Sequence, residues 1–312
     1  MAIASGILFL GFLESIAAEP LAGLTNAVHS VALQRRLDQA VAATLARPWK
    51  PALGSNELAV TVVDLGPSSA PEVASYRGQE TIYPASVIKL FYLAAAHRWM
   101  EDGVIQDTPE LRRAMRDMIV ESYNEATHYV IDVLTGTTSG PELPDAELKG
   151  WWERRNAVNR WIAGLGYPPT VNASKKPWGE GPYGRETQAI RAFEPRRNQL
   201  STDATARIVT EMALGRMVSA ARSRQMLELM SRDFTGSTKD PEDQAHGYSG
   251  IALKPGMKLW SKCGLTSETR HDAALIELAD GHRWVIVTFT TGHSEDRNII
   301  PTVVAEFLGL RR

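Results

Sequence analysis

Ser86 and Lys89 are the first residues in the sequence that could do chemistry together, in the run Ser86-Val-Ile-Lys89. Three residues make just under one helical turn, so at the start of a helix the hydroxyl and the amine lie on one face. A partly buried lysine with a lowered pKa can take the serine proton, and a helix N-terminus favours the oxyanion formed on attack. Chance supplies roughly one such spacing in a chain of this length. An ordinary helix start with a solvated lysine is the alternative.

Two further short motifs follow along the chain. Ser122-Tyr-Asn124 lies between two helical stretches, where the hydroxyl could pass a proton to a leaving group and the amide could orient a carbonyl. The alternative is that one of these residues caps the helix at Ala126. Lys262-Cys-Gly264 ends an expected strand, where lysine offers charge and glycine allows close approach. Lys254-Pro-Gly256 has the same spacing, but its proline belongs in a turn, so we discard it.

Hydrophobic period and turn residues predict the elements that position these motifs. An amphipathic helix is expected from His29 to Leu45, and a closing helix from Pro301 to Arg312. The middle, from Val87 to about Asp233, is mostly helical by period, except for a Gly- and Pro-rich loop at 166–184. Short β-branched or apolar runs bounded by turn residues predict five strands, at 58–65, 72–76, 257–262, 273–278 and 284–290.

The two ends of the chain therefore supply one α/β layer. We expect an antiparallel sheet flanked by N- and C-terminal helices, formed by residues 29–82 and 250–312. Residues 83–249 form a helical domain, with the site in a cleft at the interface. Residues 1–18 resemble an export signal, an apolar run too short to span a bilayer followed by small residues. An ordinary apolar N-terminal segment is the alternative. We expect a periplasmic or secreted protein without a membrane span after signal removal.

Composition narrows the classes of partner. Thirty-four basic and thirty-six acidic side chains give a formal net charge of −2, which offers no global electrostatic reason for a nucleic-acid partner. The single cysteine, Cys263, excludes an intrachain disulfide and a multi-cysteine metal site. The seven histidines lack metal-site spacing, so we expect no metal and no other cofactor. We expect a monomer that acts on a small-molecule or peptide-like substrate.

In this order, the three motifs resemble the signature of the penicillin-recognising serine hydrolases, specifically the class A β-lactamase-like branch, over about residues 30–312. The resemblance implies the β-lactamase/transpeptidase-like fold and an acyl-enzyme route. Ser86 would attack a strained or activated amide or ester carbonyl, with Lys89 as its base. Ser122 would relay the proton to the leaving group, and Lys262 would assist that relay and attract a carboxylate.

The resemblance also implies the residues that bind substrate. The backbone N–H groups of Ser86 and Leu265 would form the oxyanion hole, and Asn124 would hold a substrate amide. The substrate-binding set expected from the resemblance is Asn124, Asn198, Gly264, Leu265 and Arg270.

Deacylation decides the function. Class A β-lactamases use a glutamate, four residues before an asparagine, to activate the hydrolytic water. Glu194 and Asn198 match this spacing in Glu194-Pro-Arg-Arg-Asn198. A carboxylate in a shielded cleft near Lys89 could serve as the general base. A surface glutamate in a Pro- and Arg-rich loop is the alternative.

The chain departs from the family pattern at several points that change the pocket walls. The second motif follows the first sooner than usual, and the third follows later, with extra length around 150–184. Tyr123 replaces the family's aspartate and Cys263 its hydroxyl residue. Three tryptophans of the added segment could line a pocket or pack the enlarged helical domain: Trp151, Trp152 and Trp161.

We therefore expect a serine hydrolase that acts through an acyl-enzyme on a β-lactam or related amide. The alternatives are a D-alanyl-D-alanine-type peptidase or an esterase on the same fold, and a penicillin-binding sensor that is acylated without turnover.

Overall fold

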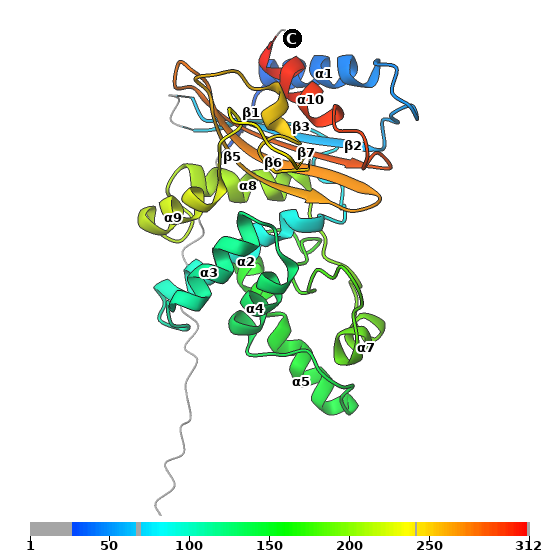
Figure 1. The fold of residues 1–312 in the computed structure, drawn as a ribbon, viewed down its shortest axis with the longest axis vertical. Coiled ribbons are helices and arrows are strands. Elements are labelled where there is room, and N and C mark those ends of the chain that lie inside the picture. The colour runs from blue at the N-terminus through cyan, green and yellow to red at the C-terminus, as the bar shows by residue number, and fades with distance from the viewer. Residues whose placement is uncertain (1–26, 67–69, 241, 311–312) are drawn as a thin grey trace, which may run out of the picture.

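A single sheet of seven strands lies between two layers of helices (Figure 1). The computed structural model describes residues 27–66, 70–240 and 242–310, so the expected export signal at 1–18 lies outside it. The strand order is β1-β3-β2-β7-β6-β5-β4, and every neighbouring pair is antiparallel except β1 and β3. The expected antiparallel α/β architecture is confirmed.

The five longer strands fall where the sequence predicts them. The two-residue strands β1 and β4 at the sheet edges were not predicted, because they are too short to show alternation. Two of the longer strands extend beyond their predicted bounds, β5 to Leu265 and β6 back to Thr269. The strands are β1 (Val28–His29), β2 (Leu58–Asp64), β3 (Glu72–Tyr76), β4 (Ser231–Arg232), β5 (Lys258–Leu265), β6 (Thr269–Glu277) and β7 (Arg283–Thr291).

The terminal helices α1 (Val31–Leu45) and α10 (Ile299–Leu308) cover one face of the sheet (Figure 1). The hydroxyl of Ser30 caps α1 by accepting a hydrogen bond from the Leu33 N–H. Apolar residues of both helices pack with the outward side chains of the sheet in one hydrophobic cluster. The N- and C-terminal helices expected beside the sheet are thus confirmed.

The opposite face of the sheet is covered by α8 (Thr202–Ala213), which lies across β2, β6 and β7. With helices on both faces, the middle strands bury side chains on both sides, so β2, β7 and the second half of β6 are mostly apolar runs rather than alternating ones. Beyond α8 lie the remaining helices. Their bounds are α2 (Lys89–Glu101), α3 (Pro109–Ile119), α4 (Asn124–Thr135), α5 (Asp145–Arg155), α6 (Ala157–Gly164), α7 (Gly184–Ala192) and α9 (Ala220–Met230).

Two features of the helical middle matter for the site. The helical stretch from Asp145 to Gly164 is divided into α5 and α6 at Asn156. The segment 166–184 carries no regular helix before α7 begins at its last residue, as expected from its glycines and prolines. A β-bridge between Asn172 and Gln199 fastens this loop to the chain that leads into α8.

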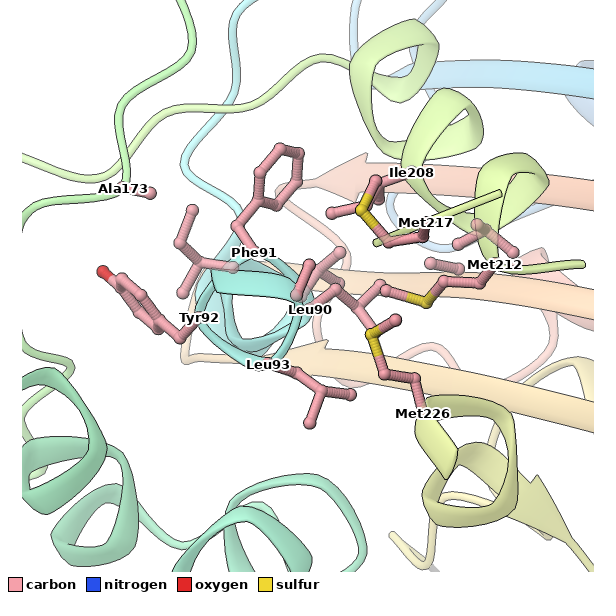
Figure 2. Packing of buried hydrophobic residues seen from close by; sticks show 14 of the residues in the cluster. Leu90, Phe91, Tyr92, Leu93, Ala173, Ile208, Met212, Met217 and Met226 are labelled. Atoms are coloured by element: carbon pink, nitrogen blue, oxygen red, sulfur yellow. The ribbon is translucent and has the colours of Figure 1, made fainter. Parts of the chain in front are cut away.

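Helix α2 is the centre of the molecule and is buried almost all round. Figure 2 shows Leu90 directed toward Met212 and Met226, while Tyr92 on the opposite side points toward Ala173. Phe91 meets Tyr167 edge-on, with ring centroids 5.6 Å apart. Such close packing fixes the first turn of α2 against the sheet.

Sheet and helices share one hydrophobic cluster, which joins β7 side chains such as Phe289 to α2, α3, α4 and α8. The division into a sheet domain and a helical domain at 83–249 stays a prediction, and α8 within that range belongs by its packing to the sheet. No helix in the described part of the chain is long and apolar enough to cross a membrane.

Candidate active site

The nucleophile candidate stands on a short turn before α2. Residues Ala85–Ile88 form a 3₁₀ turn, so Ser86 precedes the helix and Lys89 is its first residue. Ala85 has a φ of +46°, a left-handed conformation that a residue with a side chain adopts at a cost. The turn is held in place because Val87 and Ile88 are fully buried. Ser86 remains half-buried and lines a cavity.

Lys89 is completely buried and faces the second motif. Its Nζ donates to the Ser122 carbonyl oxygen at 2.6 Å and to Asn124 Oδ1 at 2.9 Å, and lies 3.3 Å from Ser122 Oγ. Burial, and next the charge of Lys262, hold the pKa of Lys89 well below its usual 10.5. A buried lysine with a lowered pKa can accept a proton from a serine, which is the role expected for a general base.

Ser122 and Asn124 do not act as helix caps. The cap position of α4 is Tyr123, which makes no side-chain capping bond. Ser122 has a φ of +59°, which turns the chain so that its hydroxyl meets both lysines. Asn124 gives its amide oxygen to Lys89 and lines the cavity. Its NH₂ group is then the part available to a substrate carbonyl.

Lys262 approaches Ser122 from strand β5. Its Nζ donates to Ser122 Oγ at 2.9 Å, to Gln244 Oε1 at 2.8 Å and to the Cys263 carbonyl oxygen at 2.9 Å. Burial lowers the pKa of Lys262 to about 8. Ser122 therefore lies between two buried amines whose pKa values are both lowered, an arrangement suited to passing a proton through its hydroxyl.

Gln244 is a site residue that the sequence analysis missed. Its Oε1 accepts from Lys262 Nζ and from the Cys263 N–H, and its Nε2 donates to the carbonyl oxygens of Ile119 and Val120. This buried side chain therefore ties β5 to the turn that carries Ser122. A lone glutamine in an irregular segment has no motif around it, so no sequence signal marks it.

Gly264 allows β5 to approach the nucleophile. A Cβ at this position would lie 2.7 Å from the Pro84 carbonyl oxygen and 3.2 Å from the Ser86 backbone nitrogen. Only glycine permits this contact without a shift of β5 or of the turn that carries Ser86. The next residue, Leu265, ends β5 and lines the cavity with Ser86. The two residues expected to form an oxyanion hole are thus neighbours across the cavity mouth.

His271 supports the same segment from strand β6. Its Nδ1 accepts from the Thr290 N–H at 3.2 Å, so Nε2 carries the proton and donates to the Tyr83 carbonyl oxygen at 2.9 Å. Burial lowers the pKa of His271 to about 4, which keeps the ring neutral. The histidine therefore anchors the chain just before Ser86 and does not titrate near neutral pH.

Ser86, Ser122 and Asn124 line one cavity of about 550 Å³, which we call the active-site cavity. Its walls come from the turns before α2 and α4, from strands β4 and β5, and from the irregular segment that follows β4 up to Tyr248. They comprise Ser86, Val120, Glu121, Ser122, Asn124, Ser231, Arg232, Asp233, Asp240, Glu242, Asp243, Gln244, Ala245, Tyr248, Cys263 and Leu265.

Glu194, the expected general base, is not brought to this cavity. Its side chain is 73% exposed and accepts a 2.8 Å hydrogen bond from Arg196 Nε. Asn198 is buried, but its amide binds the backbone of Lys175 on both sides and accepts from the Ser174 N–H. The pair thus shapes the loop before α8, and no hydrogen bond of Glu194 reaches Lys89 in the described residues.

Arg270, expected to bind substrate, is also buried in the protein. Its guanidinium donates to the carbonyl oxygens of Ser294 and Gly247 and to Glu242 Oε2 at 2.7 Å, and it stacks on Tyr248. Its place is behind the cavity wall, where it holds the segment 242–248 against β6.

The tryptophans of the added segment pack within the helical part. Trp151 is buried beneath Arg155, Trp152 stacks on Phe193, and Trp161 meets Trp99 edge-on. None of the three lines the active-site cavity in the described part of the chain. Of the two roles open from the sequence, packing is the one the structure supports.

The fold belongs to the β-lactamase/transpeptidase class. Its sheet has helices on both faces, and Ser86, Lys89 and Ser122 lie close to Lys262 of strand β5. A sequence model described as the β-lactamase enzyme family matches residues 98–306, more than half of the chain. The chain belongs to this family. The match begins after Ser86 and Lys89, so the placement of this pair rests on the structure.

Solved structures show the same fold. A β-lactamase from Sphaerobacter thermophilus superposes with a TM-score of 0.62 at 20% identity, covering 89% of this chain and 98% of that one. A β-lactamase from Chitinophaga pinensis gives 0.59 at 17% identity, covering 89% and 97%. A structure described as PBP-A gives 0.58 at 17% identity, covering 91% and 98%. A comparison with curated proteins returned no match.

Proposed function

We propose that the protein is a serine hydrolase that forms an acyl-enzyme on Ser86 with a β-lactam or a related amide or ester. The observation that carries this proposal is the double contact of Ser122 Oγ, 3.3 Å from Lys89 Nζ and 2.9 Å from Lys262 Nζ, in the cavity that Ser86 lines. Two amines joined by one hydroxyl supply both a base for the attacking group and an acid for the leaving group.

Acylation follows from these contacts. Neutral Lys89 takes the proton of Ser86, whose Oγ bonds to the substrate carbonyl carbon. The backbone N–H groups of Ser86 and Leu265 stabilise the charge on the carbonyl oxygen. When the bond to the leaving group breaks, Ser122 gives it a proton and is reprotonated by the lysines. Asn124 orients the substrate through its NH₂ group.

Deacylation is the slower half of the proposed cycle. Glu194 is exposed and bonded to Arg196, so it is poorly placed to activate a water for attack on the ester. This observation favours a second candidate function, acylation by a β-lactam with little turnover, as in a penicillin-binding sensor. A D-alanyl-D-alanine-type peptidase or an esterase would use the same acylation step.

Intact-mass spectrometry after incubation with benzylpenicillin and nitrocefin tests the proposal. We expect the wild-type mass to rise by one substrate equivalent at early times, and Ser86→Ala to show no adduct. Decay of the adduct at late times indicates a hydrolase, and persistence indicates the sensor. The proposal fails if neither β-lactam nor a panel of peptide and ester substrates acylates Ser86.

We also propose a periplasmic or secreted location and a monomeric state. The location rests on the apolar residues before Glu14 and the small residues that follow it. N-terminal sequencing of the protein from a fractionated host would show the mature end near residue 18 if the signal is cleaved. An uncleaved chain retained inside the cell would contradict this location.

A further inference from the structure

The walls of the active-site cavity are unusually rich in negative charge for a chain whose overall charge is only −2. Four of these acidic residues come from the irregular segment between β4 and Tyr248, and one precedes Ser122. They are Glu121, Asp233, Asp240, Glu242 and Asp243. The same cavity is lined by Ser86 and Ser122, so these carboxylates act on any substrate that the proposed function binds there.

Only part of this charge is neutralised by the protein. Glu242 is paired with Arg270 at 2.7 Å and with Arg297 at 3.6 Å. The pair of Glu121 with Arg116 is long, at 3.4 Å, and solvent-exposed, and Asp243 Oδ1 lies 3.4 Å from His246 Nδ1. Asp233 and Asp240 accept hydrogen bonds from their own turns, and neither has an ion-pair partner among the described residues. An excess of carboxylate therefore remains at the cavity.

The positive groups near the cavity are turned away or already bound. Arg232, the one guanidinium among the lining residues, is buried, and its Nη atoms donate to backbone carbonyl oxygens, including those of Ile119 and Ser261. Arg270 is held behind the wall. Lys262 donates to Ser122, Gln244 and its own neighbour. The three N–H groups of Lys262 are thus used within the protein, and the Nε atoms of both arginines, which have no partner among the described residues, are buried.

Cys263 adds to the same effect. The sequence has a thiol where the resemblance led us to expect a hydroxyl, and this thiol lines the cavity while being only 6% exposed. A thiol is a weak hydrogen-bond donor, so it holds a carboxylate less well than a hydroxyl does. Two observations therefore argue against the expectation that Lys262 attracts a substrate carboxylate. Its Nζ is bonded within the protein, and the neighbouring thiol is a weak donor.

We propose that the active-site cavity selects substrates bearing a cationic group, an ammonium or a guanidinium, on the side that faces Asp233, Asp240 and Asp243. Substrates with a carboxylate at that place are disfavoured. This inference rests on the proposed function, since it names the class of substrate that Ser86 would acylate. A single partly screened charge pair changes affinity by about threefold to tenfold, and several carboxylates act together.

Three matched cephalosporin derivatives test this preference. They share one acylating ring and differ only at the ring carboxyl, which is left free, converted to the methyl ester, or coupled to ethylenediamine to give a cationic amide. The second-order rate of Ser86 acylation, followed by mass spectrometry at low salt, should rise about tenfold at each step from anion to neutral to cation. The differences should shrink in about 0.5 M NaCl, because salt screens exposed charges.

Variants locate the effect. Asp233→Asn, Asp240→Asn and Asp243→Asn should each lower the cation-to-anion ratio about threefold or more. Asp38→Asn, on α1 at the other face of the sheet, is the matched control and should leave the ratio unchanged. Thermal unfolding of each variant checks that the fold is retained.

The outcomes separate the two proposals. If none of the three probes acylates Ser86, and simple peptide and ester substrates also fail, the proposed function is wrong. If Ser86 is acylated and the anionic probe reacts as fast as the cationic one or faster, the proposed function stands and the charge preference is overturned. Aspartate variants with an unchanged ratio overturn it equally.

Discussion

Lys262 donates a 2.9 Å hydrogen bond to the hydroxyl of Ser122, although 140 residues separate the two in the chain. One residue lies on strand β5 and the other on the turn between α3 and α4. The bond therefore forms only when the helical part is folded against the sheet. Gln244 braces the same junction, because it binds Lys262 on one side and the end of α3 on the other.

The first prediction concerns the pH dependence of acylation. The attack needs Lys89 neutral and the relay needs Lys262 protonated, and the two charges repel. Activity should rise with pH as Lys89 loses its proton at a pKa well below 10.5, and fall above the pKa of Lys262, about 8. Lys262→Arg should remove the falling limb, because arginine stays charged, and lower kcat/KM about tenfold.

Initial rates from pH 5 to pH 10 on one chromogenic substrate measure both limbs. The wild-type profile is the control for the variant. If Lys262→Arg keeps a falling limb near pH 8, another group is the acid and the proposed relay is wrong.

The second prediction concerns the approach of β5 to the nucleophile. Gly264→Ala places a methyl group 2.7 Å from the Pro84 carbonyl oxygen, so β5 or the turn carrying Ser86 must shift. Because the oxyanion donors lie on these two segments, acylation should fall about 100-fold or more. Stopped-flow or mass-spectrometric acylation rates measure the loss.

Gly164→Ala is the matched control, since a Cβ there meets nothing within 4 Å. It should acylate at the wild-type rate. Equal rates for Gly264→Ala and wild type would contradict the assignment of the oxyanion hole to Ser86 and Leu265.

The third prediction concerns deacylation. Because Glu194 is 73% exposed and bonded to Arg196, Glu194→Gln should change the rate of acyl-enzyme decay by about twofold or less. Single-turnover decay of the benzylpenicillin adduct measures it, with the exposed Glu153→Gln as the control. A slowing of 100-fold or more, with the adduct accumulating, would restore Glu194 to the role expected from its spacing.

The sequence predicted the parts of the site that depend on short local motifs. Ser86 and Lys89 share a turn, and the burial of Val87 and Ile88 forces that turn against the sheet. Ser122 and Lys262 could be assigned because each stands at the end of an element that apolar periodicity reveals. The contact between strand β5 and the turn before α4 then follows from the fold.

Other residues could not be placed by spacing alone. Glu194 keeps the family spacing to Asn198, yet the loop around them directs the carboxylate to solvent, and no local pattern encodes that direction. Arg270 was expected to bind substrate, but its guanidinium donates to Glu242, 28 residues away. Gln244 binds Ile119 across 125 residues, a contact that appears only in the folded chain.

The fourth prediction concerns stability in acid. His97 is 3% exposed, and neither ring nitrogen has a hydrogen-bond partner among the described residues. Burial lowers the pKa of His97 from 6.5 to about 4. In the unfolded chain His97 therefore binds a proton below pH 6.5, whereas in the folded chain it binds one only below about pH 4. Through this residue, the free energy of unfolding falls as the pH drops across that window.

His97→Leu removes this proton linkage and fills nearly the same volume with an apolar side chain. Relative to wild type, the variant should gain about 2 kcal/mol more in unfolding free energy at pH 5 than at pH 7.5. Urea unfolding at the two pH values measures the difference. His271 stays in the variant and its pKa is also lowered to about 4, so part of the acid decline remains. His29→Leu, at an exposed position, is the control, and an equal gain at both pH values for His97→Leu would rule out a neutral buried ring.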